Sequence, residues 1–177
     1  MTQAMTTTQG AATRLKTSDA GEIAANQFLT FSLANEEYGV DILRVQEIKG
    51  WTPVTHIPNA PAYLKGVLNL RGTIVPIVDL RMRFNLDAVD YTPTTVVIVL
   101  SLINEGRERT FGIVVDAVSD VLNIAPADIR PKPDFGTVVD ADFINGLATV
   151  GEHMVMLLDI DRLLRPDQVV DITSAAE

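Results

Sequence analysis

Two aspartates lie at matching places in the chain, and paired carboxylates that share a proton are the catalytic groups of aspartic proteases. Asp79 follows the run T-I-V-P-I-V, and Asp159 follows the run M-V-M-L-L. An aspartic protease needs a small hydroxyl residue and a glycine after each aspartate to aim the pair, whereas Leu-Arg and Ile-Asp follow here. We therefore expect each aspartate to cap a short helix, its side chain accepting free backbone N–H groups.

Other groups that could do chemistry are few. The sequence has no cysteine and two histidines, His56 in a loop flanked by prolines and His153 in an apolar alternation. Neither has a second histidine or a carboxylate at metal-ligand spacing, so structural or surface roles are expected. No G-x-G-x-x-G or G-K-[ST] motif occurs that would cradle phosphates. The sequence therefore predicts no catalytic residue, no metal and no cofactor.

Composition limits the class of protein. The chain has 177 residues, 47% of them hydrophobic, and a formal net charge of −9. Nucleic-acid binders gather Lys and Arg on one face, whereas here the basic residues are scattered along the sequence. No apolar run approaches the roughly 20 residues of a membrane span, and the start lacks the apolar core of a secretory signal. We expect a cytoplasmic globular protein that neither binds nucleic acid nor inserts into a membrane.

Short segments rich in Val, Ile, Phe and Thr dominate the middle of the sequence and are typical of strands. The predicted strands span residues 28–33, 37–40, 67–70, 73–78, 95–102, 110–115, 118–124, 146–150 and 153–158. Strands this short, without long helical periods between them, favour barrels or a sandwich. Residues 1–25 have no apolar period and are expected to be a disordered tail, with 165–177 as a second loose end.

An internal repeat organises these strands. The aligned segments are 28–33 with 97–102, 38–40 with 111–113, and 63–84 with 143–164. In the last pair Gly66 meets Gly146 and Asp79 meets Asp159. A unit of about 60 residues buries too little surface to be stable alone, so two units should pack together. We predict an all-β protein of two packed five-stranded barrels with short helices, the first at about 27–84 and the second at about 95–164, within a folded region of 26–164.

Polar groups that interrupt apolar strands are the candidates for contact with a partner. Glu47 follows Val45 by two residues, and Arg71 breaks a long apolar run. The Arg71-Gly72 pair is equally typical of a hairpin turn, in which glycine supplies the positive φ and the arginine is solvated. Both interpretations of Arg71 stay open on the local sequence.

Taken together, these motifs resemble the CheW family of bacterial chemotaxis coupling proteins. The resemblance rests above all on E-x-Y-G-V-D-I at 36–42 and N-L-R-G-x-I-V-P-I-V-D-L at 69–80, and it covers about residues 27–164. It implies two SH3-like five-stranded barrels packed around a hydrophobic core. It also implies a cytoplasmic adaptor without catalytic activity, which joins chemoreceptors to the histidine kinase CheA.

The resemblance implies roles for individual residues as well. Val45, Glu47 and Arg71 match family residues at or near a receptor-binding groove between the barrels. Gly66 and Gly72 match glycines that shape the neighbouring turns.

The partners implied by the resemblance are the cytoplasmic tip of methyl-accepting chemoreceptors, the regulatory domain of CheA and other CheW copies. Phe135 matches an aromatic residue used in the contact with the kinase domain. The expected location is the membrane-associated receptor array. Two alternatives stay open: a CheW-like scaffold of a non-chemotactic array, and a small-barrel module that binds oligosaccharide or single-stranded nucleic acid. The second would need exposed aromatics in a basic groove.

Overall fold

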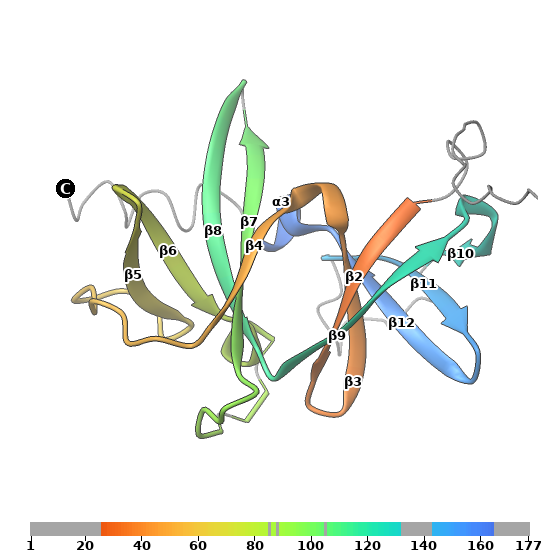
Figure 1. Cartoon of the computed structure of the whole chain (residues 1–177), viewed down its shortest axis with the longest axis horizontal. Coiled ribbons are helices and arrows are strands. Elements are labelled where there is room, and N and C mark those ends of the chain that lie inside the picture. Colours follow the sequence, from red (N-terminus) through yellow and green to blue (C-terminus); the bar gives the residue numbers. More distant parts are fainter. Residues whose placement is uncertain (1–25, 85, 88, 105, 132–142, 165–177) are drawn as a thin grey trace, which may run out of the picture.

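The computed structural model describes residues 26–131 and 143–164, apart from residues 85, 88 and 105. The expected tails, 1–25 and 165–177, and the expected kinase-contact residue Phe135 lie outside this part of the chain. The described residues form two curved β-sheets that lie side by side, with only single-turn helices between strands (Figure 1). The all-β prediction is therefore confirmed.

The first sheet, which we call sheet 1, has five strands in the order β4-β7-β8-β6-β5. Its strands are β4 (Val45–Gly50), β5 (Leu64–Leu70), β6 (Thr73–Asp79), β7 (Val96–Asn104) and β8 (Arg107–Val115). The helix α2 (Leu80–Arg83) follows β6. All neighbours in this sheet are antiparallel except β6 and β8, which are parallel.

The second sheet, sheet 2, has six strands in the order β10-β11-β12-β3-β2-β9. Its strands are β2 (Asn26–Leu33), β3 (Glu36–Asp41), β9 (Ala117–Ile124), β10 (Ile129–Arg130), β11 (Ile144–Val150) and β12 (His153–Leu158). The 3₁₀ turns η3 (Ile42–Arg44) and η4 (Pro126–Asp128) precede β4 and β10, and α3 (Ile160–Leu163) follows β12. No helix in the described ranges is both long enough and apolar enough to cross a membrane.

The two halves of the chain exchange a hairpin. The β7–β8 hairpin comes from the second repeat but lies in sheet 1, while the β2–β3 hairpin of the first repeat lies in sheet 2. Each sheet thus combines strands of both repeats, which differs from the expected division into a first barrel at about 27–84 and a second at about 95–164. The repeat itself is visible as the same arrangement of five strands in both sheets, with parallel pairs β6·β8 and β12·β3 at matching places, and sheet 2 adds β10 as a sixth strand at its edge.

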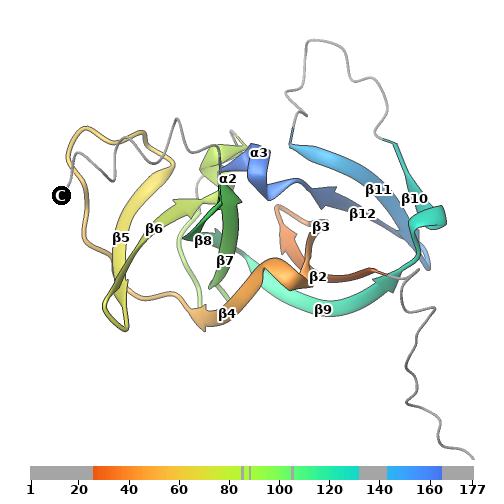
Figure 2. The ribbon, with the colours of Figure 1, turned by 90° about the horizontal axis from the view of Figure 1, so that it is seen from above.

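A short connection accounts for this exchange. Asp116 alone separates β8 from β9, and β8 ends at Val115 opposite Val96. If β9 paired with β7 of its own repeat in the register in which it pairs with β2, it would have to begin beside Ser101. That position is roughly 17 Å from the end of β8, measured along the strand. Two peptide steps reach only about 7 Å. The chain therefore continues forward into sheet 2, and β9 extends away from sheet 1 (Figure 2).

The exchanged hairpins are buried on both faces. On β7, Ile98 and Leu100 pack into the main core between the sheets, while Val97 and Val99 pack inside sheet 1. The main core also receives residues of β2, β3, β8, α2 and α3, so it joins all parts of the fold. A strand buried on both faces is expected to be a nearly continuous apolar run, as V-V-I-V-L is here.

The two aspartates cap the short helices, as predicted. Asp79 accepts from the N–H groups of Arg81 and Met82 at 3.0 and 3.4 Å. Asp159 accepts from the corresponding two N–H groups of α3 at 3.1 and 3.3 Å. Asp79 is 5% exposed and also accepts a hydrogen bond from the Tyr91 hydroxyl at 2.6 Å, so it is the more deeply buried of the two caps.

Candidate functional site

Arg71 and Glu47 form an ion pair at one end of sheet 1. The Nη2 atom of Arg71, in the turn between β5 and β6, donates to Oε1 of Glu47 on β4. Strands β4 and β5 are the two edges of the sheet, so this ion pair joins its opposite edges. The side chain of Arg71 is 76% exposed and that of Glu47 28%. The structure thus brings together two of the three residues expected to bind a receptor.

The turn that presents Arg71 has an unusual backbone. Leu70 pairs with Thr73, leaving a two-residue loop in which Arg71 and Gly72 have φ values of 52° and 88°. Positive φ at both central residues is the pattern of a type I′ hairpin, which favours Asn-Gly and costs energy for a long side chain. Arg71 and Gly72 thus form a hairpin turn, which was one of the two interpretations that the local sequence left open. Since the turn does not favour arginine, its side chain is better explained by what it contacts.

The two glycines expected in turns have different places. Gly72 lies in the turn, where its N–H donates to the Asn69 side chain at 2.8 Å. Gly66 instead lies inside β5, where the pairing register with β6 is irregular. There the backbone of Thr55 passes so close that a side chain on Gly66 would overlap its carbonyl oxygen. Gly66 therefore shapes the packing of a strand rather than a turn.

Val45, the third expected receptor-binding residue, begins β4 and packs partly against the main core. Its pairing with Leu100 and that of Glu47 with Val99 leave Gln46 as an extra residue, a β-bulge. Strand β4 was not among the predicted strands, because its half-buried positions carry Glu47 and Lys49 as well as Val45, while Ile48 lies on the exposed side.

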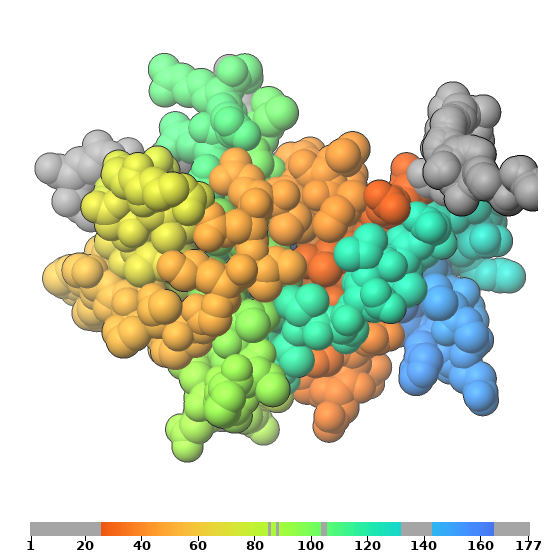
Figure 3. All heavy atoms as spheres, viewed as in Figure 1, coloured from red at the N-terminus to blue at the C-terminus, as the bar shows by residue number. Residues whose placement is uncertain are grey.

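The sequence pattern also gave no sign of an exposed apolar residue beside this strand. Leu43 in η3 is 87% exposed, although it lies only two positions before Val45. Ile48 on β4 is 43% exposed. In the space-filling view, the orange surface that contains η3 and β4 lies open across the middle of the molecule (Figure 3). Exposed leucine alone is ordinary, but here it adjoins the expected contact residues.

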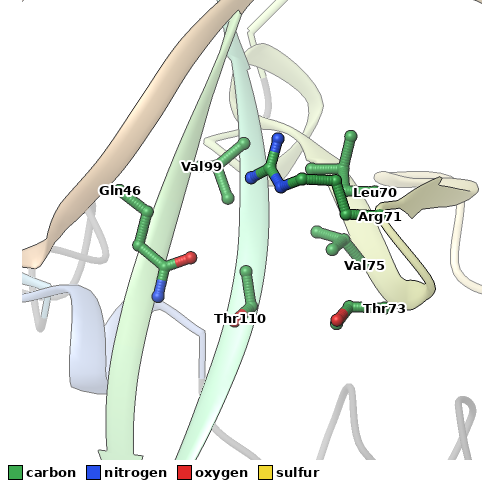
Figure 4. A pocket seen from close by; sticks show the side chains of 7 residues that line it. All are labelled: Gln46, Leu70, Arg71, Thr73, Val75, Val99 and Thr110. Atoms are coloured by element: carbon green, nitrogen blue, oxygen red, sulfur yellow. The ribbon is translucent and has the colours of Figure 1, made fainter.

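A pocket of about 250 Å³ opens beside Arg71. It is lined by Gln46, Leu70, Arg71, Thr73, Val75, Val99 and Thr110, which come from β4, β7, β8 and the β5–β6 hairpin (Figure 4). Arg71 is the only charged residue among them, and Leu70, Val75 and Val99 provide apolar contact. The lining offers hydrogen bonds and apolar surface but holds neither a nucleophile with a base nor a pair of acids.

Comparison with known proteins identifies the family. The family model described as the CheW-like domain matches residues 27–168, most of the sequence. The chain belongs to the CheW family. This confirms the resemblance that the motifs at 36–42 and 69–80 indicated.

Curated relatives of this CheW-family chain cover nearly its whole folded part. It is 48% identical to the chemotaxis protein CheW of Klebsiella aerogenes over 89% of this chain and 93% of the relative. It is 37% identical to the chemotaxis protein CheW of Rhizobium meliloti over 80% and 89% of the two chains. The crystal structure of scaffolding protein TtCheW from Thermoanaerobacter tengcongensis is similar in fold, with a TM-score of 0.71, 32% identity and coverage of 80% and 93%.

The clearest pKa shifts in this CheW-family chain lie away from the Arg71 pocket and have structural causes. Burial, followed by the hydrogen bond to Asp79, raises the pKa of Tyr91 well above its ordinary value. Burial alone would raise the pKa of Asp116, but hydrogen bonds from the Arg81 guanidinium and the Ala34 N–H outweigh this effect and lower the pKa of that carboxyl. These groups hold α2 and the β8–β9 connection in place, so their shifts indicate ion pairing and burial rather than acid–base catalysis.

The described part of this CheW-family chain also contains no candidate metal site. There, no cluster of three or more His, Asp or Glu side chains is placed to hold an ion. His56 is exposed in a loop, and His153 is exposed at the start of β12.

Proposed function

We propose that this chain is a non-catalytic chemotaxis adaptor, which couples methyl-accepting chemoreceptors to the histidine kinase CheA and so controls kinase activity. Membership of the CheW family supports the proposal, because curated relatives are named chemotaxis protein CheW and a related structure is named a scaffolding protein. In this function the protein acts in the cytoplasm at membrane-associated receptor arrays. It works by holding two partners together rather than by a chemical step.

The receptor docks, in this proposal, along η3 and β4 up to the turn that holds Arg71. The observation that carries it is the Arg71–Glu47 ion pair, which places an exposed guanidinium over a pocket in a turn that does not favour arginine. Leu43 adds exposed apolar surface two positions before Val45, which begins β4 and packs partly against the main core. A groove with apolar contacts and a charged rim suits an amphipathic helix, the form expected of a receptor tip.

The kinase partner is proposed to dock elsewhere on the chain. Its regulatory domain is expected to share the CheW-like fold, so the contact would join two similar modules. Phe135, matched to an aromatic of that contact, lies outside the described residues, and its role stays a prediction. Separate docking sites for receptor and kinase are what an adaptor requires.

The small-barrel alternative lacks support at the Arg71 pocket. Binding of oligosaccharide or single-stranded nucleic acid depends on bases or sugars stacking on aromatic side chains. None of the residues that line this pocket is aromatic. The net charge of −9 also opposes binding to phosphates.

Reconstitution tests the proposed function directly. A methyl-accepting receptor and CheA from the genome that encodes this chain are combined with the purified protein, and CheA autophosphorylation is measured. We expect activity to rise only when all three components are present. The same preparation with Arg71→Glu should lose most of the rise, because the introduced carboxylate would repel Glu47 and the exposed cation would be gone.

Two binding measurements make this result specific. Arg71→Glu should weaken capture of the receptor fragment while leaving CheA binding and the melting temperature unchanged. If the variant captures the receptor as well as the unaltered chain does, the proposed docking site is wrong. If the three components together show no rise with the unaltered chain, the adaptor function itself is contradicted.

A further inference from the structure

Two ion pairs hold the connections that cross between the sheets. The residue on the short helix is acidic in one pair and basic in the other. Arg44, at the end of η3, pairs with Asp161 on α3 through Nη1–Oδ1 and Nη2–Oδ2 distances of 3.2 and 2.9 Å. Arg81 on α2 pairs with Asp116, between β8 and β9, at 2.9 Å for both contacts. In the sequence repeat Arg81 aligns with Asp161. The helix therefore supplies the cation at one crossing and the anion at the other.

The Arg44 pair ties η3 to both sheets. Its guanidinium contacts Asp161 on the helix that ends sheet 2, and Nη1 also donates to the carbonyl oxygen of Ser101 on β7 of sheet 1 at 3.3 Å. Apolar contact holds one side of this turn, because Ile42 packs partly against the main core, whereas Leu43 is 87% exposed. Beyond the Ile42 contact and the Asp41 cap at its start, the Arg44 pair is the side-chain anchor that ties η3 to α3.

The anchor lies next to the proposed docking strand. Strand β4 begins at Val45, directly after Arg44, and its one neighbour in the described sheet is β7. An edge strand is paired along one side only, so more of its backbone is exposed and it opens locally more easily than a central strand. A shift of Arg44 would therefore pass along the backbone to Val45 and Glu47.

We propose that Asp161 is a positioning residue for β4, acting through Arg44. Because α3 follows β12, Asp161 moves with sheet 2, and its ion pair sets where β4 of sheet 1 begins. The consequence for receptor affinity rests on the proposed function, whereas the effect on the order of β4 does not. Binding that disturbs sheet 2 would reach the receptor-docking strand along this connection.

The second crossing provides a matched comparison. The Arg81 and Asp116 side chains are 16% and 30% exposed, against 30% and 47% for Arg44 and Asp161. Asp116 also accepts from the Ala34 N–H at 2.9 Å, and Arg81 donates to the Asp87 carbonyl at 2.8 Å. This pair has the same form but holds the β2–β3 turn and α2. Weakening it should disturb those elements and leave β4 in place.

Hydrogen exchange on the full chain tests the positioning role without any partner. Asp161→Asn should speed amide exchange in residues 45–50 about three- to fivefold, the effect of losing a partly exposed bidentate pair. Asp161→Glu keeps the carboxylate and should restore the protection. Asp116→Asn should speed exchange near the β2–β3 turn but not in β4. Unchanged exchange in residues 45–50 of Asp161→Asn would overturn the proposal.

Receptor affinity then separates this proposal from the proposed function. Asp161→Asn should weaken binding of the receptor-tip fragment about threefold and leave CheA binding unchanged, with Arg71→Glu measured in the same series. If Arg71→Glu weakens binding but Asp161→Asn changes neither affinity nor exchange, the positioning role is wrong and the docking site stands. If Asp161→Asn loosens β4 while both variants bind the fragment normally, the positioning role stands and the docking site is wrong.

Discussion

Gly66 on β5 lies directly against the carbonyl group of Thr55. A Cβ atom at position 66 would be 2.1 Å from the Thr55 oxygen and 2.7 Å from its carbonyl carbon. Thr55 and Val67 exchange two backbone hydrogen bonds of 2.9 and 2.8 Å, which hold the two segments together. The close approach is therefore fixed by backbone on both sides, and flexible side chains cannot relieve it.

This contact predicts that Gly66→Ala is severely destabilising. The substitution must displace the Thr55 segment or break its hydrogen bonds, and φ at Gly66 is 149°. We expect a loss of about 3 kcal/mol or more in the free energy of unfolding in urea, in the range of steric overpacking and lost backbone bonds. Gly72→Ala is the matched control: its φ is 88°, but no atom lies within 4 Å of the new Cβ, so about 1 kcal/mol is expected. Equal losses would refute the steric explanation.

The turn itself allows stability to be separated from binding. Arg71→Asn places Asn-Gly, the favoured type I′ pair, at residues with φ of 52° and 88°. We expect the melting temperature to stay the same or rise, because the exposed ion pair with Glu47 contributes little to stability. Binding of the receptor fragment should nevertheless weaken, since the guanidinium is gone. A drop in both melting temperature and affinity would mean that Arg71 serves the fold.

The lowered pKa of Asp116 predicts part of the stability that the protein loses in acid. Burial disfavours its charged form, but Arg81 and the Ala34 N–H outweigh burial and hold its pKa below the ordinary value. The stabilisation is thus present above the ordinary Asp pKa of about 4 and is lost as pH falls through the lowered pKa. Urea unfolding between pH 6 and pH 2 should show a shallower acid loss for Asp116→Asn, which starts from lower stability at pH 6. An identical pH slope in the variant would exclude this contribution.

The two helix caps should differ in their cost of removal. Asp79→Ala deletes a buried cap and leaves the Tyr91 hydroxyl without its partner, so about 2–3 kcal/mol of unfolding free energy should be lost. Asp159→Ala removes the equivalent cap, whose side chain is 29% exposed, and about 1 kcal/mol is expected. Both values come from the same urea titration. A larger loss at Asp159 would contradict the assignment of the deeper cap to Asp79.

Much of the fold was predictable because it follows from local patterns. Asp79 and Asp159 each end an apolar run before a short helix, and both are caps in the structure. The two-residue turn at Arg71-Gly72 also follows from its position between strands. Strand β4 was not predictable in the same way. Its half-buried positions carry Glu47 and Lys49 while Ile48 is exposed, so residue type does not follow the period of two on which strand prediction depends.

The sequence by itself determined the repeat, most strands, the helix caps, the lack of a recognisable catalytic motif and the resemblance to the CheW family. These depend on residue type and on spacing along the chain. Only the tertiary structure decided that β7–β8 joins β4, β5 and β6, and that Glu47 meets Arg71 across sheet 1. The periodicity of a strand shows which faces are buried but not which sheet it enters. That choice depends on the reach of the connection at Asp116 and on a core that both hairpins must fill from two sides.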